Sequence, residues 1–358
     1  MNKDISLEEA HQRIADIKAK DRPILDLGHC PDLVDLAELS GMTAVKHLDL
    51  KHCRQVRDLS PLASMTGLRT LSLAHCDQIA ALGPVAGLPE LHRITMIDCA
   101  LVKDWEVLST LCSLKSLVLG RCSGLRDLEP FRALRTLTHL TVWDCDAVRD
   151  LEPLSLLTSL ISLDLGQCQQ LTDLSPLSAL SAVQSLRLGD ASAITDLNPL
   201  SSLTALESLS LAGGRQVANL QPLSGLAKLK SLDLTENGRI TDLGGLSTLT
   251  ALESLDLTGC RRLTDLQPLA TLSALQTLTL TNCEGLEDLR PLAALTALTS
   301  LHVTGCSRLK TLPLEIIQLP RLCWLIMNGV ENVPAELQSR DEGDNCLARV
   351  KEFLMSKR

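Results

Sequence analysis

Leucine and other apolar residues recur along this chain in an order that repeats every 23 residues. The copy from Leu252 to Leu269 reads LESLDLTGCRRLTDLQPL. In it, Leu255 and Leu257 alternate with polar residues, which predicts a short strand with one buried face. A repeat of this length is typical of a solenoid, in which each coil buries its apolar side by stacking on its neighbours. We therefore expect equivalent strands to pair in parallel, so that residues 23 apart become neighbours about 4.8 Å apart.

A cysteine marks the same position of most repeats, and twelve consecutive intervals carry no insertion or deletion. The column consists of Cys30, Cys53, Cys76, Cys99, Cys122, Cys145, Cys168, Ala191, Gly214, Asn237, Cys260, Cys283 and Cys306. Because small residues replace cysteine in it, we expect reduced, buried thiols with a structural role. Cys112, Cys323 and Cys346 lie off the column.

After the strand, each repeat continues with the segment Asp-Leu-x-Pro-Leu. Asp173, Asp196 and Asp265 are placed to cap a short helical turn, in whose first turn a proline costs no backbone hydrogen bond. The whole unit resembles the leucine-rich repeat family, and this return segment resembles its internalin-like class. Internalins usually carry asparagine where this chain has cysteine, and Asn237 alone keeps it here.

The resemblance implies an α/β fold, a leucine-rich repeat solenoid with a curved parallel sheet on its concave face and short helical or 3-10 turns on its convex face. Ser6 and Glu9 form a capping box, which predicts an N-terminal capping helix over residues 1–21. We expect the solenoid itself, of about 13–14 coils, over residues 22–335. Residues 336–358 predict a C-terminal capping helix, similar to the closing segment of repeats in bacterial Roco-type proteins.

Composition narrows the classes of function. The net charge is −9, which argues against nonspecific nucleic-acid binding because that binding draws on clustered Lys and Arg. No apolar run approaches the ~18 residues that span a bilayer, and the N-terminus lacks the features of a secretory signal. We expect a monomeric, cytoplasmic protein without membrane contact.

Motifs for chemistry are absent from the sequence: no phosphate-binding glycine loop, no nucleophile elbow and no zinc-type cysteine pair. His29, His52 and His75 share one column and could offer stacked imidazoles to a metal. Each histidine and the cysteine after it should face opposite sides of the chain, however, so we interpret the histidines as a solvated rim. The sequence predicts neither an enzyme nor a cofactor or metal site.

The outward strand positions differ between the two halves of the chain. The C-terminal half is rich in small hydroxyl residues, whereas the N-terminal half includes Trp143, which has glycines 23 residues to either side. Trp105, by contrast, replaces a core leucine and is interpreted as packing. We predict an apolar notch at Trp143, with candidate partner-binding residues Trp143, Ile97, Val118, Arg93, His139, Asp98, Arg121, Asp144, His47, Asp49 and Lys51.

These patterns favour a non-catalytic scaffold that binds a protein or peptide on the N-terminal to central concave face. A Trp143 side chain that merely covers backbone is the alternative for the site. For the protein, the alternatives are a translocated bacterial effector and a regulatory subunit of an enzyme such as a phosphatase. A basic stripe, made of Arg57, Lys103, Arg126 and Arg149, precedes the capping aspartates. We interpret it as paired with those aspartates, with an acidic partner as the alternative.

Overall fold

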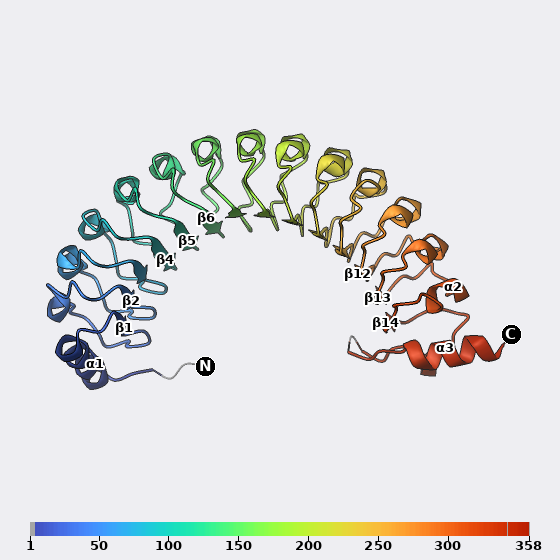
Figure 1. Cartoon of the computed structure of the whole chain (residues 1–358), viewed down its shortest axis with the longest axis horizontal. Coiled ribbons are helices and arrows are strands. Elements are labelled where there is room, and N and C mark those ends of the chain that lie inside the picture. Colours follow the sequence, from blue (N-terminus) through green and yellow to red (C-terminus); the bar gives the residue numbers. More distant parts are fainter. Residues whose placement is uncertain (1–3, 342, 358) are drawn as a thin grey trace. The chain divides into compact units, whose positions relative to one another are not determined.

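The computed structural model describes residues 4–341 and 343–357. Its internal contacts divide the chain into two compact units, residues 1–171 and residues 172–358. Within each unit the strands follow one another along one side and the short helices line the opposite side (Figure 1). This arrangement is a leucine-rich repeat solenoid, as the sequence predicts.

The first unit begins with helix α1 (Leu7–Lys20). Its strands are β1 (Ile24–Asp26), β2 (His47–Asp49), β3 (Thr70–Ser72), β4 (Arg93–Ile97), β5 (Ser116–Gly120), β6 (His139–Trp143) and β7 (Ser162–Asp164). Its 3-10 helices are η1 (Ala37–Leu39), η2 (Ser60–Ser64), η3 (Gly83–Val85), η4 (Trp105–Thr110), η5 (Glu129–Phe131) and η6 (Glu152–Leu156).

The second unit continues the same alternation. Its strands are β8 (Ser185–Arg187), β9 (Ser208–Ser210), β10 (Ser231–Asp233), β11 (Ser254–Asp256), β12 (Thr277–Thr279), β13 (Ser300–Val303) and β14 (Trp324–Met327). Its helices are η7 (Ser175–Ala179), η8 (Asn198–Ser202), η9 (Gln221–Gly225), η10 (Gly244–Leu246), η11 (Gln267–Thr271), η12 (Arg290–Ala294), α2 (Leu314–Ile317), η13 (Ala335–Leu337) and α3 (Leu347–Ser356).

Strand pairing follows the 23-residue period. In the first unit Leu48 pairs with Leu71, and in the second Leu232 pairs with Leu255, both in parallel strands. The leucines of these strands point inward and are at most 2% exposed, whereas the residues between them remain accessible. Alternation of apolar and polar residues therefore sets which face is buried, and the predicted phase is confirmed within each unit.

The column cysteines are buried and all thirteen cysteines of the chain are free. Most of their thiols also donate hydrogen bonds to the coil before them: Cys76 Sγ lies 3.0 Å from the carbonyl oxygen of Leu50, and Cys283 Sγ lies 3.1 Å from that of Leu257. Asn237 uses its side-chain amide in the same way, 2.9 Å from the carbonyl oxygen of Leu211. At most of its positions the column therefore satisfies a backbone carbonyl of the preceding coil, a role beyond that of a small apolar residue.

The return segments form 3-10 helices with proline in the first turn, as at η7 and η11. The predicted aspartate caps form, but one residue earlier than a standard N-cap: Asp173 Oδ1 accepts the N–H of Ser175 at 2.8 Å, an Asx turn. The predicted capping box is half made. Ser6 accepts the N–H of Glu9, while the carboxylate of Glu9 binds Arg13.

Candidate protein-binding surface

The outward side chains of β1–β7 make up what we call the strand face of the first unit. In its register, Ile97 on β4 pairs with Gly120 on β5, and Gly120 pairs with Trp143 on β6. Trp143 and Ile97 are both partly exposed at the ends of their strands. The structure therefore brings the two apolar residues of the predicted notch into one row with glycine between them.

The indole of Trp143 lies over Gly120. A methyl group added to Gly120 would collide with Cε2, Nε1 and Cζ2 of this ring. The ring thus lies over one of its two glycine neighbours, and it covers the backbone there, so we call this surface the Trp143 platform. This position is compatible both with the predicted partner-binding role and with the alternative of a ring that merely covers backbone. Trp105 differs in kind, because it is only 4% exposed and packs in the core as expected.

A series of contacts between charged side chains holds the ring of Trp143 in place. The guanidinium of Arg121 lies 4.7 Å from the centre of the Trp143 ring, within the range of a cation–π contact. Asp98 accepts two hydrogen bonds from Arg121, at 2.5 and 2.7 Å, and also lies 2.6 Å from Nδ1 of His75. Arg121 above all, helped by His75, lowers the pKa of the Asp98 carboxyl. Arg121 is thereby oriented before any partner arrives.

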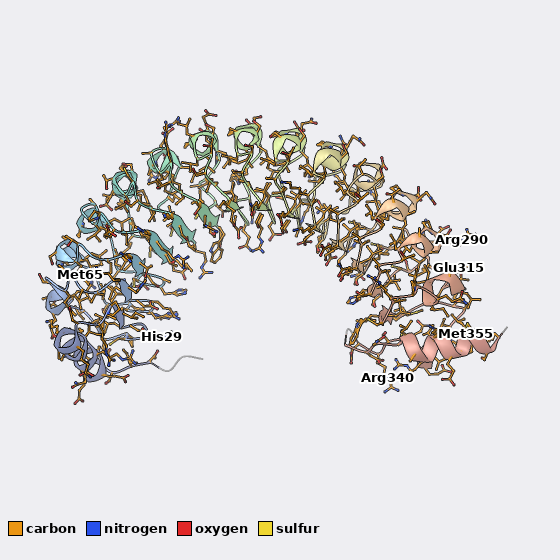
Figure 2. All side chains as sticks on the ribbon, viewed as in Figure 1. His29, Met65, Arg290, Glu315, Arg340 and Met355 are labelled. Atoms are coloured by element: carbon orange, nitrogen blue, oxygen red, sulfur yellow. The ribbon has the colours of Figure 1, made fainter. Side chains whose placement is uncertain are left out.

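The predicted histidine column stacks ring on ring. The ring centres of His29 and His52 are 4.6 Å apart, and those of His52 and His75 are 4.2 Å apart with nearly parallel planes. Figure 2 shows His29 on the strand side of the first unit. Burial and the neighbouring imidazoles lower the pKa of His52. Stacked rings do not converge on one point, and no three potential ligands are grouped for a metal within residues 4–341 and 343–357.

The remaining candidate binding residues lie on different strands, or at different positions along a strand. Arg93 and His139 begin β4 and β6, so they lie about four residues, roughly 13 Å, from the row of Trp143. Val118 occupies the middle of β5 between these two rows. Asp144 follows Arg121 in the next coil, whereas His47, Asp49 and Lys51 lie on or next to β2, four strands from β6. The candidate residues of β4–β6 therefore lie in two rows, one at the start and one at the end of these strands, with Val118 between them, and the residues at β2 lie apart from both rows.

The expected pairing of the basic stripe with the capping aspartates is not found in the described part of the chain. Among the described residues, Arg57, Lys103, Arg126 and Arg149 have no carboxylate within 4.0 Å. The aspartates beside them instead accept backbone N–H groups of the turns, as Asp127 does from Glu129.

What sequence reasoning missed is the chain of contacts from His75 through Asp98 and Arg121 to Trp143. Its signal was present, because residues 75, 98 and 121 are 23 apart and Trp143 lies one position away from the same series. Opposite charges at consecutive positions of one column predict ion pairs between coils.

Comparison with known proteins also indicates a leucine-rich repeat fold. A family model described as leucine-rich repeats, two copies, matches residues 227–271. No curated protein sequence matches the chain significantly. An internalin (inlF) of Listeria monocytogenes is similar in structure, with a TM-score of 0.72, 24% identity, and 89% of this chain and 94% of that chain covered. A leucine-rich repeat protein of Leptospira interrogans gives a TM-score of 0.66 and 21% identity over 92% and 95% of the two chains.

The family model identifies residues 227–271 as leucine-rich repeats, and the described residues have the fold of a leucine-rich repeat solenoid. Such folds generally serve as scaffolds for protein–protein interaction. The two structural neighbours bear on the fold alone at these levels of identity. Within the described residues, no helix is both long and apolar enough to cross a bilayer.

Proposed function

We propose that the protein is a non-catalytic scaffold that binds a protein or peptide on the strand face of its first unit, the face that the sequence predicts to be concave. The observation that carries this proposal is the arrangement of Trp143. Its ring is partly exposed on a strand position, lies over a glycine and is in contact with an arginine fixed by Asp98. Tryptophan and arginine are the residues most enriched among binding hot spots.

Preorganisation supports the same conclusion. Binding usually costs about 0.5–1.5 kcal/mol for each flexible side chain that becomes immobilised. The ring of Trp143 already rests on Gly120, and Arg121 is already held by two hydrogen bonds. A partner that covers this platform would therefore lose little side-chain entropy, so a few contacts suffice for useful affinity.

We also infer that the protein works in a reducing, cytoplasmic compartment. Its thirteen free cysteines support this inference, because exposed and neighbouring thiols persist where reductants keep disulfides from forming. Cys112 and Cys323 are exposed, so they report the compartment most directly. Recovery of both as free thiols after alkylation in intact cells would agree with it, and their recovery in disulfides would contradict it.

The partner-binding role is tested by comparing two variants in a pull-down followed by affinity measurement. Trp143→Ala should weaken binding of the recovered partner by at least ~2 kcal/mol, as loss of a hot spot does. Ser254→Arg introduces a large side chain on β11 of the second unit and should leave binding unchanged. Equal loss from both variants, or from neither, would remove this site from the interface.

A further inference from the structure

A second feature of the first unit lies at the start of its strands. Lys46, Arg69, His92 and Lys115 are consecutive in the ladder: the N–H of each of the last three donates to the carbonyl oxygen of the one before, at 2.7 to 2.8 Å. Arg93 follows His92 and is exposed. We call these five residues the basic row.

The basic row places the charged side chains of Lys46 and Arg69 in adjacent coils, and those of Arg93 and Lys115 in the two coils that follow. Neighbouring coils are about 4.8 Å apart, and like charges directly opposite each other in a sheet are destabilising. Among the described residues, Glu90 is the one carboxylate within 4.0 Å of the row, and it lies 3.6 Å from Arg69. Lys46, Arg93 and Lys115 make no ion pair in the part of the chain that the structure describes.

In the second unit, the equivalent position just before the strand carries charges of both signs. There Glu207, Lys230 and Glu253 are consecutive in the ladder, and their signs alternate. Lys230 Nζ lies 2.7 Å from a carboxylate oxygen of Glu207. The same structural position thus carries residues of alternating sign in the second unit and a basic row, of which only Arg69 is paired, in the described part of the first unit. Packing therefore does not dictate the basic row.

We propose that the basic row binds an acidic segment of a protein partner. The proposal rests on the proposed function and adds the charge class of the partner. The protein has a net charge of −9, so a basic row with one ion pair is the local exception that attracts carboxylates and orients the encounter. The row spans three coil spacings, about 14 Å, which an extended segment of a few acidic residues can cover.

Arg93 connects this row to the Trp143 platform, because it begins β4, the strand that ends at Ile97. A partner with an acidic stretch beside an apolar one would thus reach both along a single set of strands. The basic row supplies charge recognition and the platform supplies the buried anchor.

The test uses the full chain and a fluorescently labelled oligoglutamate peptide, titrated at low and at physiological ionic strength. Wild type should bind the peptide, and salt should weaken the binding. Arg93→Glu with Lys115→Glu should weaken it at least about tenfold, since two attractive charges become repulsive. Lys228→Glu with Arg215→Glu, which reverses two exposed charges of the second unit, is the matched control and should retain the wild-type affinity.

A further variant and a further probe complete the test. Arg93→Gln with Lys115→Gln should give an intermediate loss, and it replaces the reversal pair if that variant unfolds. Trp143→Ala should leave oligoglutamate binding unchanged, so failure of this inference and failure of the platform give different results. Absence of peptide binding, equal loss with Lys228→Glu and Arg215→Glu, or binding to phosphatidylserine vesicles in place of the peptide would overturn the proposal.

Discussion

The residue before each column cysteine adopts a left-handed backbone conformation, which only glycine takes without strain. The second unit places Gly213, Gly259 and Gly305 at this position in alternate coils. The first unit has a side chain there in seven consecutive coils: His29, His52, His75, Asp98, Arg121, Asp144 and Gln167. Each costs about 1 kcal/mol relative to glycine. Because this strained conformation carries a side chain in every coil of the first unit, we infer that these side chains have a role. The contacts that link His75, Asp98 and Arg121 are such a role.

Gly120 offers a test at this scale, because a methyl group there would displace the indole of Trp143 from its place. Gly120→Ala should weaken binding of the partner by about 1 kcal/mol, since the ring would lose its preorganised position. Gly189→Ala is the matched control: it lies in the same column, and its methyl would meet only Ala212 O at an ordinary 3.6 Å. Affinity is measured for both variants, and unchanged affinity in Gly120→Ala would show that the ring position is unimportant.

The 23-residue spacing predicts the row that joins Ile97, Gly120 and Trp143, and the structure confirms it. It does not predict which way the ring turns. Trp143 has a glycine on each side, Gly120 and Gly166, so neither neighbour carries a side chain that would bias the choice of rotamer. The prediction also groups Arg93 with Ile97 because both point outward. In the structure they lie at opposite ends of β4, so they belong to different parts of the surface.

Among the elements, the return turns show how one coil supports the next. Most turns carry their own aspartate, such as Asp150, whose Oδ1 accepts the N–H of Glu152 at 2.8 Å. Helix η3 lacks one because Ala81 occupies that position. Asp104 of the next coil supplies it instead, accepting the N–H groups of Leu82 and Gly83 at 2.9 to 3.0 Å. The motif predicts a cap in each turn, but a substitution in one coil is compensated by its neighbour in a way that no single repeat reveals.

Asp104→Ala should therefore destabilise the protein by about 1–2 kcal/mol, because it leaves two N–H groups of another coil without their acceptor. The free energy of unfolding from denaturant titration measures this loss. Adding Ala81→Asp to the variant restores an aspartate to the turn itself and should recover part of the stability. A double variant no more stable than Asp104→Ala would contradict the sharing of this cap between coils.

At the scale of the whole molecule, the sequence predicts the fold almost entirely, because one template recurs without insertion and each copy carries both its strand and its turn signals. What the template does not contain is the hydrogen bonding of the column. The cysteines were expected to be small apolar residues, yet their thiols bond to carbonyl oxygens 26 residues earlier in both units, as Cys53 and Cys306 do. The position of a cysteine in the repeat predicts that its side chain is buried. Which carbonyl oxygen its thiol bonds to depends on the side-chain rotamer, which the repeat does not specify.

The same column gives the protein a predictable sensitivity to alkali. Burial raises the pKa of Cys53, Cys99, Cys145 and Cys260 from 9.0 to about 12. Above about pH 9 the unfolded chain therefore releases thiol protons that the folded chain retains, so the unfolded state binds fewer protons and stability falls as pH rises. Each such thiol lowers the free energy of unfolding by up to about 1.4 kcal/mol per pH unit between its unfolded and folded pKa.

Denaturant titrations under reducing conditions, from about pH 8 to about pH 10, measure this dependence below the range in which lysines titrate extensively. Cys53→Ala with Cys260→Ala is expected to reduce the slope, because two of the thiols no longer ionise on unfolding. Alanine already occupies the column at Ala191, so both substitutions are compatible with the coil. Cys112→Ala with Cys323→Ala removes the two exposed cysteines and should leave the slope unchanged, since folding does not bury these side chains. A slope equal in all three proteins would show that the buried thiols do not govern alkaline stability.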